Sequence, residues 1–209
     1  MTLADPALHR DPREALLALT AEMVEEGALL IPRVLPAGPE AFRQWEHYPR
    51  GDAIDPESGA RWFYHAHPPE QRGPNEHGHF HIFLPLSAFD GIRPLVAPRK
   101  DDAVPVVHVA GLNFDRDGLP ATWMTVNHWV TDEYLMPSKA IIARLDRLRL
   151  DGAGESKGIA KVGRWLTLAL RASRRDLEAI LRERDERLGD VDPHDKANEV
   201  LSSRPFTID

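Results

Sequence analysis

The feature that most constrains this chain is a cluster of histidines with alternating spacing. Seven of the ten histidines lie between residues 65 and 128, and five of them fall in a seventeen-residue stretch, from Tyr64-His65-Ala66-His67 to Glu76-His77-Gly78-His79-Phe80-His81. In an extended strand, residues two apart point to the same face. We therefore predict strands here, with His77, His79 and His81 in one imidazole row. Buried ring nitrogens need partners, so function is expected at this cluster.

Two strands carry the cluster in this interpretation. The first covers residues 61–67 and the second residues 76–84, with a proline- and glycine-rich loop between them. If they pair as a hairpin with His67 opposite His77, His65 falls opposite His79 and all five imidazoles share a face. A one-residue slip would separate the two rows.

A second hairpin is predicted around Asp115-Arg116-Asp117-Gly118, between the runs 104–114 and 119–130. With Asp115 opposite Leu119, His108 faces Val126 and lies diagonal to His128 on the same side. Both histidines would then join one site. A four-residue loop without a glycine bulge would instead place them on opposite faces.

Helical patterns flank these strands. Asp11-Pro12-Arg13-Glu14 predicts a helix start that runs to about Gly27, and a short helix is predicted over 39–47 before a turn-rich stretch over 52–60. Helical spacing returns after Ser138. A flexible link over 151–158 precedes a longer helical region, broken once, that ends near Gly189. The tail after Pro193 is expected to be irregular.

The predicted architecture is one α+β domain over residues 1–209. It has a helical entry over 11–47, histidine-bearing strands over 61–130 in a central, mostly antiparallel sheet, and helices over 138–189 packed on one face. Trp62, Trp123 and Trp129 are expected on the face opposite the histidines, in the core.

Composition limits the function classes. The chain has no cysteine, which excludes disulfides, thiolate zinc sites and a cysteine nucleophile, so nitrogen and oxygen must hold any metal. The formal charge of -7 and the isoelectric point near 5.8 argue against nucleic acid as a partner. No apolar run approaches about eighteen residues, and early charges do not fit a secretory signal. We expect a cytoplasmic protein with no membrane partner, and the sequence does not specify its oligomeric state.

Metal binding is the leading functional expectation. Imidazoles suit iron, copper and zinc, and strands can hold two or three of them around an ion that keeps an open position. The predicted ligands are His65, His67, His77, His79, His81, His108 and His128. Seven imidazoles exceed the needs of one ion, so two nearby ions are also considered.

A metalloenzyme, either an oxidoreductase or a hydrolase, would use such a site on a small-molecule substrate by activating oxygen or water. His79, Glu76 and Glu133 are the candidate catalytic residues, although strict alternation points Glu76 away from His77. Taken singly, each histidine is as well explained as a partner of a carbonyl or carboxylate, and each acid as a solvated strand end. A metal- or haem-binding module without catalysis is a further alternative.

A short segment resembles the histidine triad motif, in which three histidines alternate with hydrophobic residues. It is His77-Gly78-His79-Phe80-His81-Ile82-Phe83. The resemblance implies nucleotide phosphate hydrolysis or transfer, with His79 matching the nucleophile and His77 and His81 supporting phosphate binding and proton transfer. The chain departs from that family because Gly78 takes a hydrophobic position, a polar proline-rich loop precedes the motif, and a long C-terminal region follows it.

More of the chain resembles an uncharacterised bacterial family of unknown function. The shared segments are Tyr48-Pro49, Gly51-Asp52, Tyr64-His65-Ala66-His67, Glu76-His77-Gly78-His79-Phe80-His81 and Trp129-Val130-Thr131. The resemblance implies that residues 40–135 belong together, and it supplies no activity.

Overall fold

The computed structural model describes residues 11–36, 42–100, 104–153 and 156–208. Its strands are β1 (Tyr48–Ile54), β2 (Arg61–His65), β3 (Glu76–Pro85), β4 (Val106–Asp115), β5 (Pro120–Val126) and β6 (Val200–Pro205). Its α-helices are α1 (Pro12–Glu25), α2 (Ile31–Val34), α3 (His128–Thr131), α4 (Ser138–Ile142), α5 (Lys157–Ala172) and α6 (Arg174–Arg187). Short 3-10 turns lie at Pro69–Gln71, Leu86–Phe89 and Leu145–Arg147.

The six strands form one antiparallel sheet in which each strand pairs with its neighbours in sequence, in the order β1-β2-β3-β4-β5-β6. The helices α3 to α6 lie in the connection from β5 to β6. The prediction of an α+β fold with a central antiparallel sheet is therefore confirmed.

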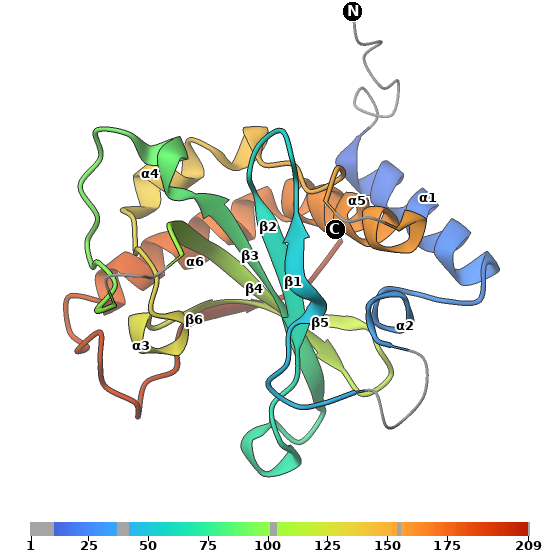
Figure 1. The fold of residues 1–209 in the computed structure, drawn as a ribbon, viewed down its shortest axis with the longest axis horizontal. Helices are drawn as coiled ribbons and strands as arrows, with labels where there is room; N and C mark the ends of the chain where they lie inside the picture. Colours follow the sequence, from blue (N-terminus) through green and yellow to red (C-terminus); the bar gives the residue numbers. More distant parts are fainter. Residues whose placement is uncertain (1–10, 37–41, 101–103, 154–155, 209) are drawn as a thin grey trace, which may run out of the picture.

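The long helices cover one face of this sheet, with α5 and α6 across the strands and α1 beside α5 (Figure 1). We call this the core face. Its side chains alternate along the strands and join the main hydrophobic cluster, which includes Trp62, Tyr64, Phe80, Ile82, Leu112, Phe114 and Trp123. Trp62 and Trp123 are fully buried, as expected for core residues, whereas Trp129 lies in α3.

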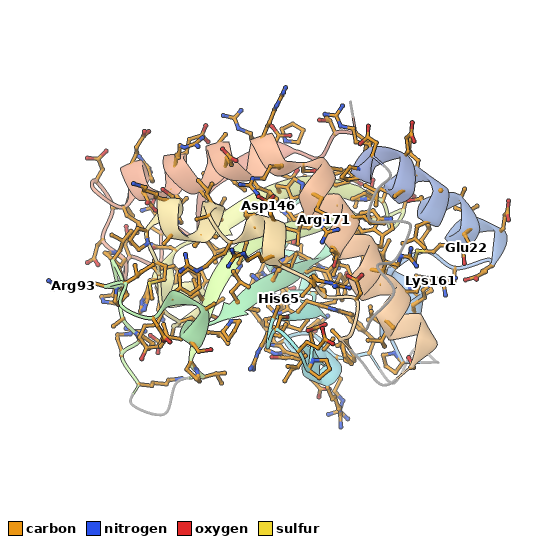
Figure 2. The ribbon with its side chains drawn as sticks, turned by 90° about the horizontal axis from the view of Figure 1, so that it is seen from above. Glu22, His65, Arg93, Asp146, Lys161 and Arg171 are labelled. Atoms are coloured by element: carbon orange, nitrogen blue, oxygen red, sulfur yellow. The ribbon has the colours of Figure 1, made fainter. Side chains whose placement is uncertain are left out.

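Ion pairs fix α1 against α5. Lys161 Nζ on α5 lies 2.6 Å from a carboxylate oxygen of Glu22 and 2.6 Å from one of Glu26 (Figure 2). Both acids are largely exposed, so these contacts add little to the packing energy of the apolar interface.

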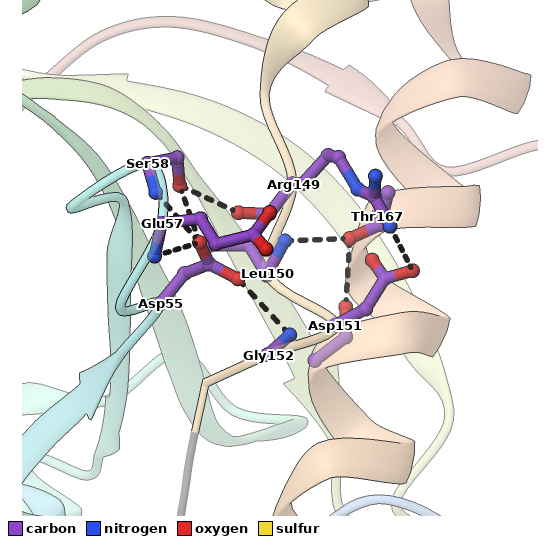
Figure 3. Close-up of polar contacts among 9 residues, drawn as sticks. Asp55, Glu57, Ser58, Arg149, Leu150, Asp151, Gly152 and Thr167 are labelled. Atoms are coloured by element: carbon purple, nitrogen blue, oxygen red, sulfur yellow. Dashed lines mark hydrogen bonds and ion pairs between the residues drawn. The ribbon is translucent and has the colours of Figure 1, made fainter. Parts of the chain in front are cut away.

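A buried carboxylate connects the turn between β1 and β2 to the loop that leads into α5. Asp55 accepts hydrogen bonds from Ser58 N and Oγ at 2.8 and 2.9 Å and from Gly152 N at 3.0 Å (Figure 3). A side chain at Gly152 would place its Cβ 2.6 Å from Asp55 Oδ2, so glycine is required for this approach.

Three predictions at the ends of the sheet are wrong. Residues 42–47 are not helical, because Trp45 adopts φ 67° and its N–H donates to Ala66 O, and residues 37–41 of the predicted helix lie outside the described residues. The predicted break at 48–52 is strand β1. The expected irregular tail contains β6, held by long-range contacts such as Thr125 Oγ1 to Ser202 Oγ at 2.6 Å.

The helix predictions are otherwise close to the structure. The first helix ends just before Gly27, which has φ 79°, and the long C-terminal helical region breaks once, at Ser173. Residues 154–155 of the predicted link lie outside the described residues. Among the helices of the described segments, none combines the length and apolar character that crossing a membrane requires.

Candidate metal centre

Three imidazoles from two adjacent strands meet on the sheet face opposite the helices. His65 on β2 is the Cα partner of His79 on β3, as predicted, and His81 is two residues further along β3. The ligand nitrogens of the three side chains all lie within 4.8 Å of one another. Their exposures of 8%, 3% and 0% show that this histidine face is as dry as the core. We call His65, His79 and His81 the histidine triad of the site.

Hydrogen bonds orient the triad's rings. His79 Nδ1 lies 3.1 Å from Glu76 Oε1, so the carboxylate accepts the Nδ1 proton and leaves His79 Nε2 directed at His65 Nε2, 2.7 Å away. His81 Nδ1 lies 3.0 Å from His108 Nε2. His81 Nε2 is buried and has no hydrogen-bond partner among the described residues. Such an atom is a costly vacancy in a dry site unless a ligand completes it.

A bulge in β3 decides which residues join this face. Glu76 pairs with Asp115 and Gly78 pairs with Phe114, so His77 is an extra residue in β3. Beyond it the alternation reverses, which brings Glu76 to the side of His79.

His77 therefore leaves the row. Its Nδ1 contacts Tyr64 Oη on the core face, and its ring borders a separate cavity near Ile31 and Gly118. The prediction that all five imidazoles share a face is wrong for His77, because strict alternation does not hold through a bulge.

A second bulge brings in His108. Ile82 pairs with Ala110 but Phe83 pairs with His108, so Val109 is the extra residue of β4. His108 thereby faces His81 instead of the core. Burial lowers the pKa of His108 to about 3, so it is neutral at physiological pH.

Aromatic rings cover the outer side of the triad. Trp45 stacks on His67 with centroids 4.3 Å apart, and the His67 ring lies 5.1 Å from the His65 ring and 5.0 Å from the His79 ring. His47 stacks on Phe63 at 3.5 Å. His67 lies just after β2 and borders the triad without joining its closest group.

Burial also keeps these imidazoles unprotonated. It lowers the pKa of His65 to about 2 and that of His67 to about 4, and neighbouring His79 adds to both shifts. Burial lowers the pKa of His81 well below its ordinary value. A neutral imidazole offers a lone pair, which is the form that binds a metal ion.

His128 lies elsewhere. β5 ends at Val126, and His128 is the first residue of α3, where its Nε2 lies 3.8 Å from Asp132 Oδ1 and its ring 5.3 Å from that of His194. The predicted facing of His108 and Val126 also fails. The turn at Asp115 forms as expected, but a bulge between Asn113 and Phe114 shifts the register, so Gly111 pairs with Met124.

Glu133 also lies outside the triad, in a neighbouring cavity. This cavity, of about 330 Å³, shares Phe63 and Phe83 with the histidine face. Burial, with the nearby Asp52 and Asp132 carboxylates as further causes, raises the pKa of Glu133 to about 8, although a hydrogen bond from Thr131 acts in the opposite direction.

Sequence reasoning missed several neighbours of the site. Trp45 and His47 fall in a segment predicted to be helical. Glu199, whose pKa is raised by burial and lowered by nearby His79, comes from the segment before β6. No local pattern marks these residues, because only the tertiary fold brings them to the histidines.

Comparisons with known proteins place the chain in a family but give it no activity. Neither the curated proteins nor the solved structures include a match. A family model described as a domain of unknown function matches residues 10–208, well beyond the stretch 40–135 expected from short segments. The resemblance to a family without an assigned function is thus confirmed, and the chain belongs to the family described as Domain of unknown function (DUF6969).

Proposed function

We propose that this protein binds one transition-metal ion through the histidine triad, His65, His79 and His81, and uses it as a metalloenzyme on a small molecule. The observation that carries the proposal is the convergence of three dry imidazoles whose ligand nitrogens lie within 4.8 Å, one of them a buried nitrogen without a partner among the described residues. Few structural roles would explain this arrangement, since it leaves hydrogen-bonding capacity unused.

The donor set fits a borderline metal. Three neutral imidazoles suit zinc, copper or iron, and small ring rotations would bring all three nitrogens to the roughly 2.0–2.1 Å typical of zinc–imidazole bonds. Three protein ligands leave a position for a substrate or water. When bound, the ion would supply Lewis acidity or, as iron or copper, one-electron chemistry.

The surrounding residues have distinct parts in this proposal. Glu76 acts as a positioning residue, because its carboxylate fixes the tautomer and ring orientation of His79. His108 does the same for His81. His67 and Trp45 shield the triad from solvent. Removal of bulk water strengthens the electrostatic interactions at such a site.

The histidine triad motif of nucleotide hydrolases is less well supported as a functional parallel. That reading needs His77, His79 and His81 to act together, whereas His77 contacts Tyr64 on the opposite face. Binding of metal or haem without catalysis differs from the main proposal only in turnover.

Metal content tests the proposal. The protein, produced without a histidine tag, would be dialysed against equimolar zinc, copper(II) and iron(II), each in turn, and analysed by mass spectrometry for metals. We expect one tightly held ion per chain for at least one metal, lost in His81→Ala.

The matched control is His77→Ala, two residues from His79 on the same strand but on the opposite face. It should keep the ion. Circular dichroism would check that both variants fold. Wild-type protein that takes up none of the three metals would overturn the proposal, as would equal loss in two folded variants.

A further inference from the structure

The cavity beside the triad has the composition of a ligand site. It encloses about 330 Å³, within the usual size range for small-molecule pockets. Phe63, Phe83, Val104 and Val106 form an apolar wall. The polar residues facing them are His47, Asp52, Arg61, Lys100, Thr131, Asp132 and Glu133.

The apolar wall connects the cavity to the histidine triad. The Phe63 ring lies 5.4 Å from the His65 ring and 5.2 Å from the His81 ring, and Phe83 lies 6.1 Å from His81. A molecule against this wall would thus be one aromatic layer away from the triad.

Charge pairing leaves the cations of the cavity unmatched. Asp132 accepts from Arg99 N at 3.2 Å and lies 3.5 Å from Arg99 Nε, and Asp52 lies 3.1 Å from His47 Nδ1. Arg61 has only a distant contact, 3.9 Å from Asp52. No ion pair is found for Lys100 within the described residues.

Unpartnered polar atoms cluster around the same cavity. Arg61 Nε, Asp132 Oδ2 and Glu133 Oε2 are all buried without a hydrogen-bond partner in the described part of the chain. Three such atoms around one cavity indicate a missing polar ligand or ordered water, because buried polar groups are otherwise satisfied.

We propose that this cavity binds a small organic carboxylate with an aromatic or apolar body, its anionic group held by Arg61 and Lys100 and hydrogen-bonded by the carboxyl of Glu133. As the substrate class of a metalloenzyme, this inference rests on the proposed function. As a binding site, it stands on the cavity itself.

Glu133 makes the binding dependent on pH. Because its pKa is raised to about 8, the carboxyl is protonated at neutral pH and donates to an anion. Above that pH it ionises and repels the anion. The other charged or titratable groups around it are His47, Asp52, Arg61, Lys100 and Asp132.

Calorimetric titration at pH 7 with benzoate, neutral benzamide and cationic benzylamine tests the ligand class. We expect benzoate to bind at least tenfold more tightly than either analogue. Arg61→Gln should weaken benzoate at least fivefold. Arg93→Gln, an exposed arginine that projects from the edge of the molecule (Figure 2), should leave it unchanged.

Two further arms separate this site from the metal. Benzoate binding should persist in His79→Ala freed of metal, and its loss there would show that the anion binds the metal instead. Raising the pH from 7 to 9.5 should weaken benzoate binding in the wild type but not in Glu133→Gln. No benzoate binding, preference for benzylamine, or indifference to Arg61→Gln would overturn the inference.

Discussion

The two faces of the central sheet come from the same strands but are built on different principles. On the core face, Trp62 and Phe80 pack with ring centroids 5.5 Å apart beneath α5 and α6, and apolar burial stabilises the fold. On the histidine face, His65, His79 and His81 occupy alternating positions of β2 and β3 and are just as buried. Dry imidazoles contribute less to folding than dry hydrocarbon, so the comparison separates residues kept for stability from residues available for chemistry.

The largest expected effect breaks the core face. Trp62→Ala removes a fully buried ring and should lower the free energy of unfolding by roughly 3–5 kcal/mol. Chemical denaturation followed by circular dichroism measures it. A loss below about 1 kcal/mol would contradict the assignment of this face as the core.

The counterpart on the histidine face is His81→Leu. An apolar side chain of similar size fills the space of an imidazole whose Nε2 has no partner in the described residues, so we expect unfolding of the metal-free protein to change by less than about 1.5 kcal/mol. Metal binding should be lost. A collapse in stability as large as that of Trp62→Ala would remove the distinction between the faces.

A smaller effect tests the bulge that assigns residues to the faces. A Cβ on Gly78 would lie 2.4 Å from Tyr64 Oη and 2.5 Å from His65 O. Gly78→Ala should therefore destabilise the protein by roughly 1–3 kcal/mol. In Gly73→Ala the nearest atom lies at 3.6 Å, so that variant serves as the control in thermal denaturation. Equal melting temperatures would contradict the close approach.

Glu76→Gln sharpens the account of the histidine face. The amide keeps the shape but accepts the His79 Nδ1 proton more weakly, so metal affinity should fall about 10- to 100-fold with little change in stability. Competition with a chromophoric chelator gives the affinity. Glu70→Gln, an exposed acid in the preceding loop, is the control. Unchanged affinity in Glu76→Gln would argue against its positioning role.

The smallest effect concerns the pH dependence of stability. The folded-state pKa of Glu133, about 8, lies above its unfolded value near 4.5, so its contribution is fully present below about pH 4.5 and is lost as the pH rises to about 8. Glu133→Gln should remove this decline, a change on the order of 1 kcal/mol between pH 5 and pH 9. Melting temperatures across that range test it, and parallel curves would contradict the shift.

Local patterns predicted the fold class and the core. Alternation along β2 and β3 put Trp62 on one face and His65 opposite His79 on the other, and capping residues located α1. Strand β6 escaped prediction because its short, serine-containing segment becomes a strand only by pairing with β5, which is distant in sequence.

Part of the candidate site was also beyond local reasoning. Each β-bulge shifts alternation by one residue, which exchanged Glu76 for His77 and turned His108 toward His81. A bulge depends on pairing with another strand, and the Gly78 slot beneath Tyr64 is visible only in three dimensions. Trp45 reaches the site through a backbone bond to Ala66 that no helical pattern could predict.

The most direct test of the central claim is X-ray absorption spectroscopy of the metal-loaded protein. The account predicts a first shell that contains three imidazole nitrogens, reduced to two in any metal retained by His81→Ala and unchanged in His77→Ala. A shell without imidazoles, or one that loses an imidazole in His77→Ala and not in His81→Ala, would contradict it.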